Sequence, residues 1–382
     1  MLPKINNAML IVTHGCNLAC RYCFVHQEPS RMDYGTAQEA AEFLIRNSSE
    51  KEPPAINFFG GEPMVMWDEV IVPLTEWIRR EYKKPFTLSI TTNGTLLKPD
   101  RIAYMKQNGF GLLLSIDGDR ETQDYNRPRH DGSGSFDAIA ANIPRILEAW
   151  PQVTFRSTII PPTVQHLYKN YCFAEKSGFK NMFVVPNVYE DWRDEDWAAL
   201  GEQMRLVSEH IIRSCRDGKL PVAMNPVIKT MGDAELIKTY NGERRLMQKC
   251  AADGKCGLGA SRFASIHPNG NVYGCQEMTS NEGEESPFYI GNIRTGISEA
   301  RRYTLMGRYD CHSLRGDDCA HCPFDRICDG GCVANNYLVT GDINRQPDFQ
   351  CKWMRLLLNE ANYIMAELKG NQKLAELRGR RT

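Results

Sequence analysis

Three cysteines near the N-terminus form the most chemically informative pattern in the chain. Cys16, Cys20 and Cys23 follow a C-x3-C-x2-C spacing, which places three thiolates on one short loop. A four-iron cluster needs four ligands, so a cluster bound here keeps one iron open to chelate a small molecule, as catalytic metal sites do. The alternatives are a zinc site completed by His14 or His26, or cysteines that pack in a core.

A second group of candidate site residues lies at the ends of predicted strands. Gly60 and Gly61 let the backbone approach a ligand closely because no Cβ intervenes, and the adjacent Glu62 can pair with an ammonium group. An ordinary Glu-Pro turn is the alternative. Ser115 and Asp117 end another apolar run, where their side chains can reach ribose hydroxyls at the mouth of a buried sheet.

The order of these motifs resembles the radical S-adenosylmethionine (SAM) enzymes. The cysteine loop follows the apolar run 9–12 and precedes the motifs at 57–63, 89–94 and 114–118. The resemblance implies a [4Fe-4S] cluster whose open iron chelates SAM, and a 5'-deoxyadenosyl radical that abstracts hydrogen from the substrate. The cluster ligands are then Cys16, Cys20 and Cys23, and the residues around SAM are Gly60, Gly61, Glu62, Asn93, Ser115 and Asp117.

Apolar runs alternate with amphipathic stretches through about the first half of the chain, which predicts repeated βα units around a parallel sheet. We expect strands at 8–13, 55–59, 86–91, 111–116, 154–159 and 181–185, and helices at 37–47, 69–82, 99–107, 136–149 and 164–176. Six units give an α/β fold with a partial (β/α)6 barrel, the fold that the resemblance implies. Residues 194–229 are expected to be helical and bridging.

Eight further cysteines in the second half form another pattern, with C-x2-C-x5-C-x3-C at its centre. It resembles the SPASM extension of radical SAM enzymes. The resemblance implies a cysteine-rich C-terminal domain with two auxiliary [4Fe-4S] clusters, and so three clusters in all. One is bound by Cys250, Cys256, Cys275 and Cys332, and the other by Cys319, Cys322, Cys328 and Cys351. Spacing alone does not divide these eight residues, and zinc ribbons are the alternative.

Length and composition limit the organisation of the chain. A chain of 382 residues, 42% of them apolar, exceeds one typical domain. We expect a barrel over 1–200, a helical bridge over 201–248, the SPASM domain over 249–355, and a helix and tail over 356–382. The net charge of -1 argues against nucleic-acid binding. Without a predicted membrane span or signal peptide, the chain is expected to be cytoplasmic, where cysteines stay reduced.

The resemblance implies an oxidoreductase that acts on a polypeptide, and two reactions remain open. The first choice is a thioether or carbon-carbon cross-link in a ribosomally made peptide, with the auxiliary clusters accepting the electron. The alternative is formylglycine formation by an anaerobic sulfatase-maturing enzyme. That group has an acidic base where this chain has Gln276, and an amide cannot accept a proton. Gln276 and Glu277 are therefore weak catalytic candidates, while Arg127 and Arg129 can hold a carboxylate.

The expected partners follow from the same resemblance. They are a peptide or protein substrate and a reducing electron donor such as flavodoxin or ferredoxin. Because the first strand begins almost at residue 1, leader recognition is expected to need a separate leader-binding protein or a groove of the chain's own. A hypothesis of another class is a non-catalytic iron-sulfur or zinc protein, although an electron carrier does not require the glycine and S-x-D-G motifs.

Overall fold

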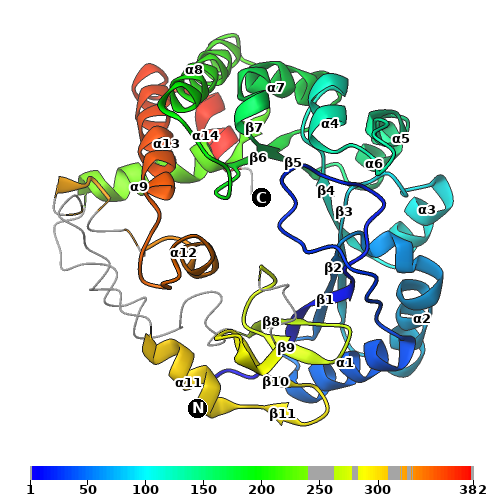
Figure 1. Ribbon diagram of the computed structural model, residues 1–382. Coiled ribbons are helices and arrows are strands. Elements are labelled where there is room, and N and C mark those ends of the chain that lie inside the picture. The colour runs from blue at the N-terminus through cyan, green and yellow to red at the C-terminus, as the bar shows by residue number, and fades with distance from the viewer. Residues whose placement is uncertain are drawn as a thin grey trace.

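One mixed sheet runs through the part of the chain that the structure describes (Figure 1). The structure is a computed structural model that describes residues 2–239, 262–277, 283–308, 319, 321–324, 328 and 330–379. Two of the expected cluster ligands, Cys250 and Cys256, lie outside these residues.

The strands and helices have the following bounds. The strands are β1 Asn7–Thr13, β2 Ala55–Gly60, β3 Thr87–Thr92, β4 Gly111–Ser115, β5 Thr154–Ile159, β6 Asn181–Pro186, β7 Ala223–Met224, β8 Phe263–Ile266, β9 Asn271–Tyr273, β10 Tyr289–Asn292 and β11 Gly296–Ile297. The helices are α1 Tyr34–Asn47, α2 Val72–Glu81, α3 Pro99–Gln107, α4 Arg120–Asn126, α5 Phe136–Ala140, α6 Ile143–Ala149, α7 Leu167–Lys176, α8 Asp194–Arg216, α9 Asn225–Thr239, α11 Glu299–Arg308, α12 Val333–Thr340, α13 Asp348–Glu367 and α14 Gln372–Arg378.

The sheet has the strand order β11-β10-β9-β8-β1-β2-β3-β4-β5-β6-β7. Neighbours from β8 to β7 are parallel, and β9, β10 and β11 continue the sheet with antiparallel pairs. The six strands expected in the first half are confirmed, each within about one residue. The parallel order and the helices between the strands confirm the predicted α/β barrel, which β7 and β8 extend at its two edges.

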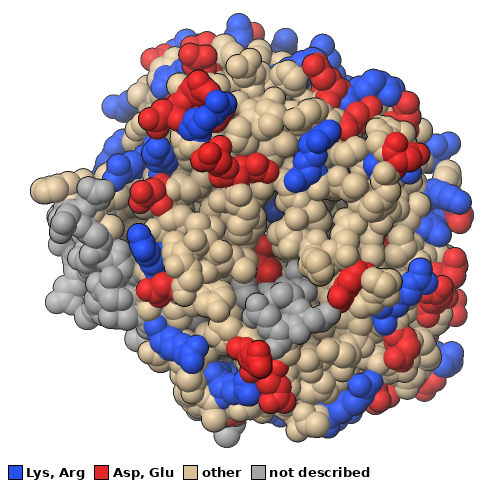
Figure 2. Space-filling view, viewed as in Figure 1, with Lys and Arg blue, Asp and Glu red and all other residues tan. Residues whose placement is uncertain are grey.

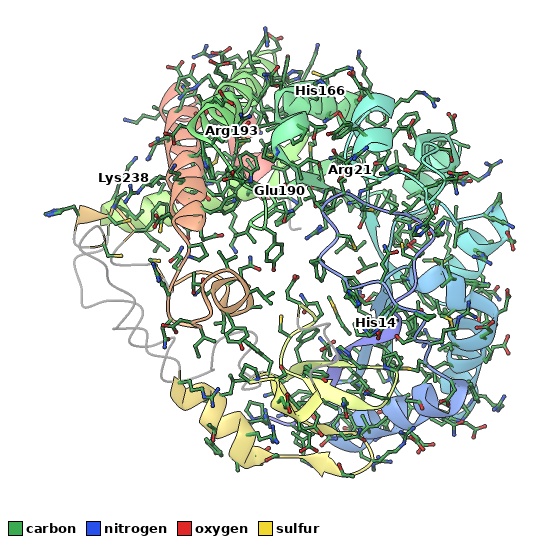
Figure 3. All side chains as sticks on the ribbon, viewed as in Figure 1. His14, Arg21, His166, Glu190, Arg193 and Lys238 are labelled. Carbon is green, nitrogen blue, oxygen red and sulfur yellow. The ribbon has the colours of Figure 1, made fainter. Side chains whose placement is uncertain are left out.

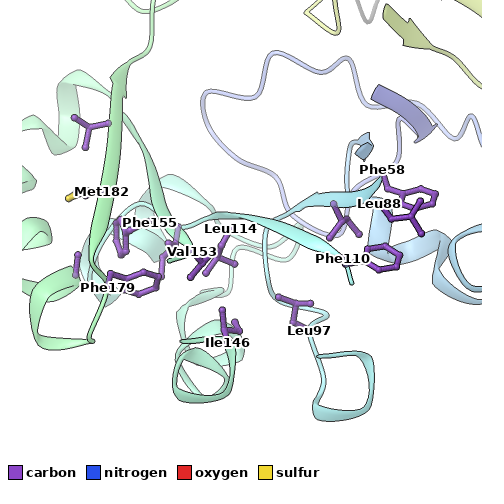
Figure 4. Close-up of a cluster of buried hydrophobic side chains, with 14 of the residues drawn as sticks. Phe58, Leu88, Leu97, Phe110, Leu114, Ile146, Val153, Phe155, Phe179 and Met182 are labelled. Carbon is purple, nitrogen blue, oxygen red and sulfur yellow. The ribbon is translucent and has the colours of Figure 1, made fainter. Parts of the chain in front are cut away.

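The outer face of the parallel strands forms the main hydrophobic core. Alternate residues point to opposite faces of a strand, and one set is fully buried under the helices. Phe58, Leu88, Leu114, Phe155 and Met182 show this position on five successive strands (Figure 4). The remaining residues of each strand therefore face the concave side of the sheet.

The expected helical segment over 194–229 is wrong in its middle. Helix α8 ends at Arg216, and Gly218 follows with a φ of +74°, a conformation that glycine adopts without strain. Pro221 has no N–H to continue a helix. The chain then forms β7, which pairs with β6, before α9 begins at Asn225.

Two other expected helices differ in detail. The segment 136–149 is two helices, α5 and α6, and Pro144 lies in the first turn of α6, where its missing N–H is tolerated. The segment 164–176 begins as a 3₁₀ turn, Pro161–His166, before α7. Helix α4 after the fourth strand was not expected.

The C-terminal helices pack against the barrel helices. Helix α13 lies beside α8 (Figure 1), with ion pairs between Arg205 and Glu360 at 2.9 Å and between Lys352 and Asp194 at 3.2 Å. Helices α8 and α13 continue across the boundaries expected at 200 and 355, so the division into four segments stays a prediction. No helix in the described ranges is both long and apolar enough to span a membrane.

Candidate functional site

The cysteine loop, residues 14–24, leaves the end of β1 and docks onto the segment after α4. Backbone hydrogen bonds join Ala19 N–H to Pro128 O at 2.8 Å and Arg21 N–H to Asn126 O at 3.0 Å. The His130 ring lies 3.0 Å from the Cys16 carbonyl oxygen through its Nε2 atom. Contacts from a distant part of the chain therefore fix the shape of this loop.

The three thiols of the loop differ in their surroundings. Burial raises the pKa of Cys16 to about 12 and that of Cys20 to about 11, whereas Cys23 is exposed. Metal ligation removes these protons. Three thiols on one loop, with the Asn93 side-chain amide 3.8 Å from Cys16 Sγ, form a donor set that fits an iron-sulfur cluster.

A single metal ion fits the described residues less well than a cluster. No three Cys, His, Asp or Glu side chains among them lie close enough to share one ion. The ligands of a four-iron cluster bind different irons and need not meet at one point. His14, a candidate zinc ligand, faces Glu28 at 3.1 Å and Ser30 at 2.6 Å through Nδ1, while its buried Nε2 has no hydrogen-bond partner among the described residues.

The two glycines at the end of β2 hold the start of the cysteine loop. Gly60 has a φ of +135°, and a Cβ there would lie 2.0 Å from the Thr13 carbonyl oxygen. A Cβ on Gly61 would lie 2.3 Å from Gly15 O, closer than real Cβ contacts occur. The Gly61 N–H donates to Thr13 O at 2.9 Å, and the Glu62 N–H donates to Gly15 O at 3.0 Å. The close approach at these glycines is thus to the chain's own backbone.

The Glu62 carboxylate joins the ends of β2 and β3. It is buried and accepts hydrogen bonds from Thr92 Oγ1 at 2.8 Å, Met64 N–H at 3.0 Å and Asn93 N–H at 2.7 Å. Burial raises its pKa to about 7, against the effect of these donors. The Asn93 amide in turn donates to Asn17 Oδ1 at 2.9 Å, so Glu62 and Asn93 connect two strand ends to the cysteine loop.

Asp117 lies in a closed network rather than at an open strand end. Its buried carboxylate accepts hydrogen bonds from Arg127 at 3.1 Å, Asn126 at 3.1 Å, the Thr158 N–H at 2.9 Å and the Tyr22 hydroxyl. This placement favours a positioning task over contact with a ribose. The sequence motif identified Asp117, but its partners on the cysteine loop, α4 and β5 were missed because they are distant in sequence.

The concave face of the sheet carries polar side chains. Asn57 on β2 hydrogen-bonds to Ser89 at 2.9 Å and Thr91 at 3.1 Å on β3. Ser115 at the end of β4 pairs in register with Arg156 on β5. This face borders the centre of the molecule, where the space-filling view is hollowed (Figure 2). Polar side chains here are available to a ligand.

The described C-terminal cysteines form two neighbourhoods. Cys319, Cys322 and Cys328 each raise the pKa of Cys351, which burial brings to about 11. Elsewhere, burial raises the pKa of Tyr189, on the loop after β6, and Cys332 and Cys275 raise it further. The Tyr189 hydroxyl also donates to Asn335 Oδ1 at 3.2 Å. Asn335 belongs to α12, which begins directly after Cys332.

Glu277 faces the barrel. Burial raises its pKa, and the positive charge of Arg156 on β5 opposes that effect. Glu277 also raises the pKa of Tyr189. The Gln276 amide oxygen lies 3.8 Å from Cys275 Sγ. Arg156 and Tyr189 are therefore site residues that sequence reasoning missed, and an arginine amid apolar residues of a predicted strand was the available signal for the first.

Side chains from several elements surround this central space. Arg21 on the cysteine loop and Glu190 on the loop after β6 both lie around it, and His14 lies near the end of β1 (Figure 3). The site is thus bounded by the barrel strands, the cysteine loop and the C-terminal cysteine-rich region.

Fold, cysteine loop and motif order together define a class of protein. The sequence profile of the radical SAM superfamily matches residues 10–169, which include the loop and β2 to β5. Residues 10–169 are therefore a radical SAM domain, as the motifs predicted. Such a domain implies a [4Fe-4S] cluster and SAM.

Two similar proteins represent different groups within that class. The cysteine-type anaerobic sulfatase-maturating enzyme of Clostridium perfringens is 21% identical over 87% of this chain and 89% of its own. The radical SAM cyclopropyl synthase TigE of Paramaledivibacter caminithermalis is 24% identical over 93% of this chain and 73% of its own.

Solved structures confirm the fold. The sulfatase-maturating enzyme anSMEcpe with bound AdoMet has a TM-score of 0.74 at 18% identity, covering 97% of this chain and 98% of its own. The same enzyme with AdoMet and the Cp18Cys peptide has a TM-score of 0.71 at 19% identity, covering 94% and 99%. Streptococcus suis SuiB bound to its precursor peptide SuiA has a TM-score of 0.63 at 15% identity, covering 91% and 76%.

Proposed function

We propose that this chain is a radical SAM oxidoreductase that modifies a residue of a peptide or protein. The observation that carries the proposal is the hollowed concave face of the sheet with its polar side chains, which borders the cysteine loop on one side and the C-terminal cysteines on the other. Relatives of both groups support a polypeptide substrate, because anSMEcpe and SuiB are solved with peptides bound. A non-catalytic iron-sulfur carrier does not need a SAM domain.

The cysteine loop would hold the [4Fe-4S] cluster through Cys16, Cys20 and Cys23. When bound, this cluster and SAM together supply the 5'-deoxyadenosyl radical that abstracts hydrogen from the substrate. The chain's own residues position these groups: Gly60, Gly61 and Glu62 fix the loop, and Asn93 lies against Cys16. Ser115 remains the candidate for direct contact with SAM, while Asp117 and Arg127 support the surrounding backbone.

Two auxiliary clusters complete the proposed set of three. Cys322 and Cys328 pack against the same small apolar cluster, and Cys319, Cys322 and Cys328 all lie near enough to Cys351 to raise its pKa; this grouping supports a second auxiliary cluster at those residues. The joint influence of Cys275 and Cys332 on Tyr189 supports a first one there, with Cys250 and Cys256 as its other ligands. Clusters with four protein ligands have no free iron for substrate, so we assign them the electron that leaves the substrate radical.

A cross-link is the first candidate product. A thioether or carbon-carbon bond would require the loss of two hydrogens from the substrate, one as a hydrogen atom taken by the deoxyadenosyl radical and one as a proton, with the remaining electron accepted by an auxiliary cluster held by the C-terminal cysteines. A flavodoxin or ferredoxin would supply electrons for SAM cleavage, and a separate leader-binding protein would deliver the peptide.

Formylglycine formation is the second candidate, and the position of Glu277 favours it. Gln276 occupies the place of the acidic base and cannot accept a proton. Glu277 supplies a carboxylate one residue later, and it faces Arg156 and Tyr189 on the barrel side. A carboxylate there can remove the substrate proton that accompanies electron loss.

Mass spectrometry of peptides separates these candidates. Anaerobically reconstituted protein is incubated with SAM, dithionite, candidate peptides encoded near the gene and a sulfatase peptide containing Cys or Ser. Loss of two hydrogens without reaction toward an aldehyde-specific hydrazide indicates a cross-link or a dehydrogenation. Reaction with the hydrazide indicates formylglycine, including the Ser case, which also loses two hydrogens. Release of 5'-deoxyadenosine with no altered peptide in either set would contradict polypeptide modification.

A further inference from the structure

Arg156 occupies the concave face of the barrel. Its neighbour in sequence, Phe155, points to the opposite face and packs against Phe173 and Phe179 under the outer helices. Because side chains alternate along a strand, Arg156 points inward. It pairs in register with Ser115 on β4 and with Phe183 on β6, so these three residues form one row across the sheet.

This arginine has no counter-ion among the described residues. Its side chain makes neither a hydrogen bond nor an ion pair with any of them. The guanidinium carbon lies over the Phe183 ring, 5.8 Å from the ring centre. The buried carboxylate of Asp117 is already paired with Arg127 at 3.1 Å. No ion pair within 4.0 Å joins Arg156 and Glu277, although each affects the pKa of the other.

Arg156 is half-buried, and a cation in that position without a counter-ion is costly unless a partner arrives. Removing a charge from water without a counter-charge or hydrogen bonds destabilises the folded protein, and burial accordingly lowers the pKa of Arg156. The guanidinium group offers parallel donors that match both oxygens of a carboxylate. Phe183, with 38% of its surface exposed, adds an apolar wall beside those donors. The row is therefore suited to an anionic group attached to an apolar chain.

We propose that Arg156 binds a carboxylate of the polypeptide substrate, from an Asp or Glu side chain or the chain terminus, close to the residue that is modified. The inference rests on the proposed function and names a feature of its substrate. SAM offers a carboxylate too, but chelation would hold that group at the open iron of the cysteine loop, which follows β1. Arg156 lies on β5, four strands along the sheet.

A charge-swap experiment tests this assignment. Reconstituted wild-type protein and the Arg156→Glu variant are each incubated with SAM, dithionite and a synthetic random-sequence peptide library, and modified peptides are sequenced by mass spectrometry. We expect wild-type products to be enriched in Asp, Glu or a nearby C-terminus, and variant products to be enriched in Lys or Arg. Arg145→Gln, on the exposed surface of α6, removes a positive charge elsewhere and should keep the wild-type preference.

Steady-state kinetics on one modified peptide gives the magnitude. Replacing its carboxylate by the amide should raise KM roughly ten- to hundredfold with little change in kcat, as for loss of a charged hydrogen-bonding partner. Arg156→Gln should raise KM similarly, and its KM should be the same for the carboxylate and the amide peptide. Arg156→Lys should recover part of the affinity. Circular dichroism and SAM binding of the Gln variant should match wild type.

Three results would overturn the inference. Library products without an acidic preference would show that Arg156 does not select a substrate carboxylate. Weaker SAM binding by Arg156→Gln, with no effect of peptide charge, would assign the carboxylate to SAM. Release of 5'-deoxyadenosine by wild type with no modified peptide, either from the library or from the peptides encoded near the gene and supplied with any leader-binding protein encoded beside them, would remove the polypeptide substrate itself. The proposed function would then fail as well, which distinguishes this outcome from the first two.

Discussion

Close contact between two stretches of backbone explains the two glycines at the end of β2. The sequence motif predicts that Gly60 and Gly61 give access to a ligand, and the structure places Thr13 and Gly15 against them. Strand β2 and the cysteine loop can therefore approach only if both positions lack a side chain. Any effect of these glycines on SAM would act through the position of the loop.

Gly61→Ala is expected to displace the cysteine loop. The new Cβ would lie 2.3 Å from Gly15 O and 2.6 Å from His14 O, so the loop must shift. Reconstituted variant protein should lose about four irons per chain, the content of one cluster. Gly232→Ala in α9, where nothing lies within 4 Å of the new Cβ, is the control and should keep its iron. Full iron content in Gly61→Ala would refute the role of the close contact.

Glu277→Gln is expected to change the pH dependence of modification. Burial raises the pKa of Glu277 above its ordinary value of 4.5, so the carboxylate becomes a base only as pH rises through that higher value. Wild-type product formation should therefore increase as pH rises through the raised pKa of Glu277, and the variant should lose this increase. Uncoupled release of 5'-deoxyadenosine is the internal control and should be equal in both. An unchanged pH profile for product would show that Glu277 is not the base.

At the scale of elements, periodicity predicts what is long and amphipathic. All six expected strands are present because each is a buried apolar run flanked by helices that cover its outer face. Strand β7 has two residues and no periodicity to detect. Helix α4 has seven residues, of which Thr122, Gln123 and Asn126 are buried polar groups, so its sequence lacks an apolar stripe.

The same reasoning explains what could be predicted of the site. Local spacing predicts that Cys16, Cys20 and Cys23 lie together, because neighbouring residues share one loop. The partners of Asp117 come from three separate segments, and Arg156 affects the pKa of Glu277, which lies in a distant part of the chain. Contacts of that kind depend on how the sheet curves and where the C-terminal region docks, which no local pattern encodes.

The start of α1 provides a test at this scale. Asp33 is the N-cap: its carboxylate accepts the Thr36 N–H at 2.7 Å and the Thr36 hydroxyl at 2.9 Å, which lowers its pKa. Asp33→Ala should cost about 1 kcal/mol and lower Tm by about 1–2 °C.

The charge of Asp33 determines how the stability of the folded protein changes with pH. A lowered pKa means that the stabilisation is present above the ordinary value of 3.8 and is lost as pH falls through the folded-state pKa. Asp33→Asn keeps the acceptor without the charge, so its difference from wild type in thermal unfolding should shrink as pH falls toward that range. A difference that grows with acidity would contradict the assigned cap charge.

At the scale of the whole molecule, the C-terminal region is attached to the barrel at several points. Strand β8 pairs with β1, and Arg294 donates to Thr36 at 2.7 Å at the start of α1. The buried Arg302 donates to the Pro3 carbonyl at 2.8 Å. Cys351 lies in the first turn of α13, which packs on the barrel helices. The two sets of cysteines are therefore held by one continuous framework, although they lie in different parts of the chain.

Two cysteine variants separate radical generation from electron acceptance within that framework. Replacing Cys322 and Cys328 by Ala should remove about four irons and sharply reduce modified peptide, because the substrate radical loses its electron acceptor. Uncoupled SAM cleavage should persist, since the open iron belongs to the cysteine loop. The matched variant with Ala at all three loop cysteines should also lose about four irons but should release no 5'-deoxyadenosine.

The contrast between these variants depends on an intact fold. Cluster ligation stabilises small cysteine-rich regions, so circular dichroism must first show that the barrel helices remain folded in both proteins. If the folded Cys322/Cys328 variant lacks one cluster yet modifies peptide at the wild-type rate, that cluster is structural and does not accept the electron. If the loop variant still releases 5'-deoxyadenosine, SAM is cleaved elsewhere and the assignment of the N-terminal cysteines is wrong.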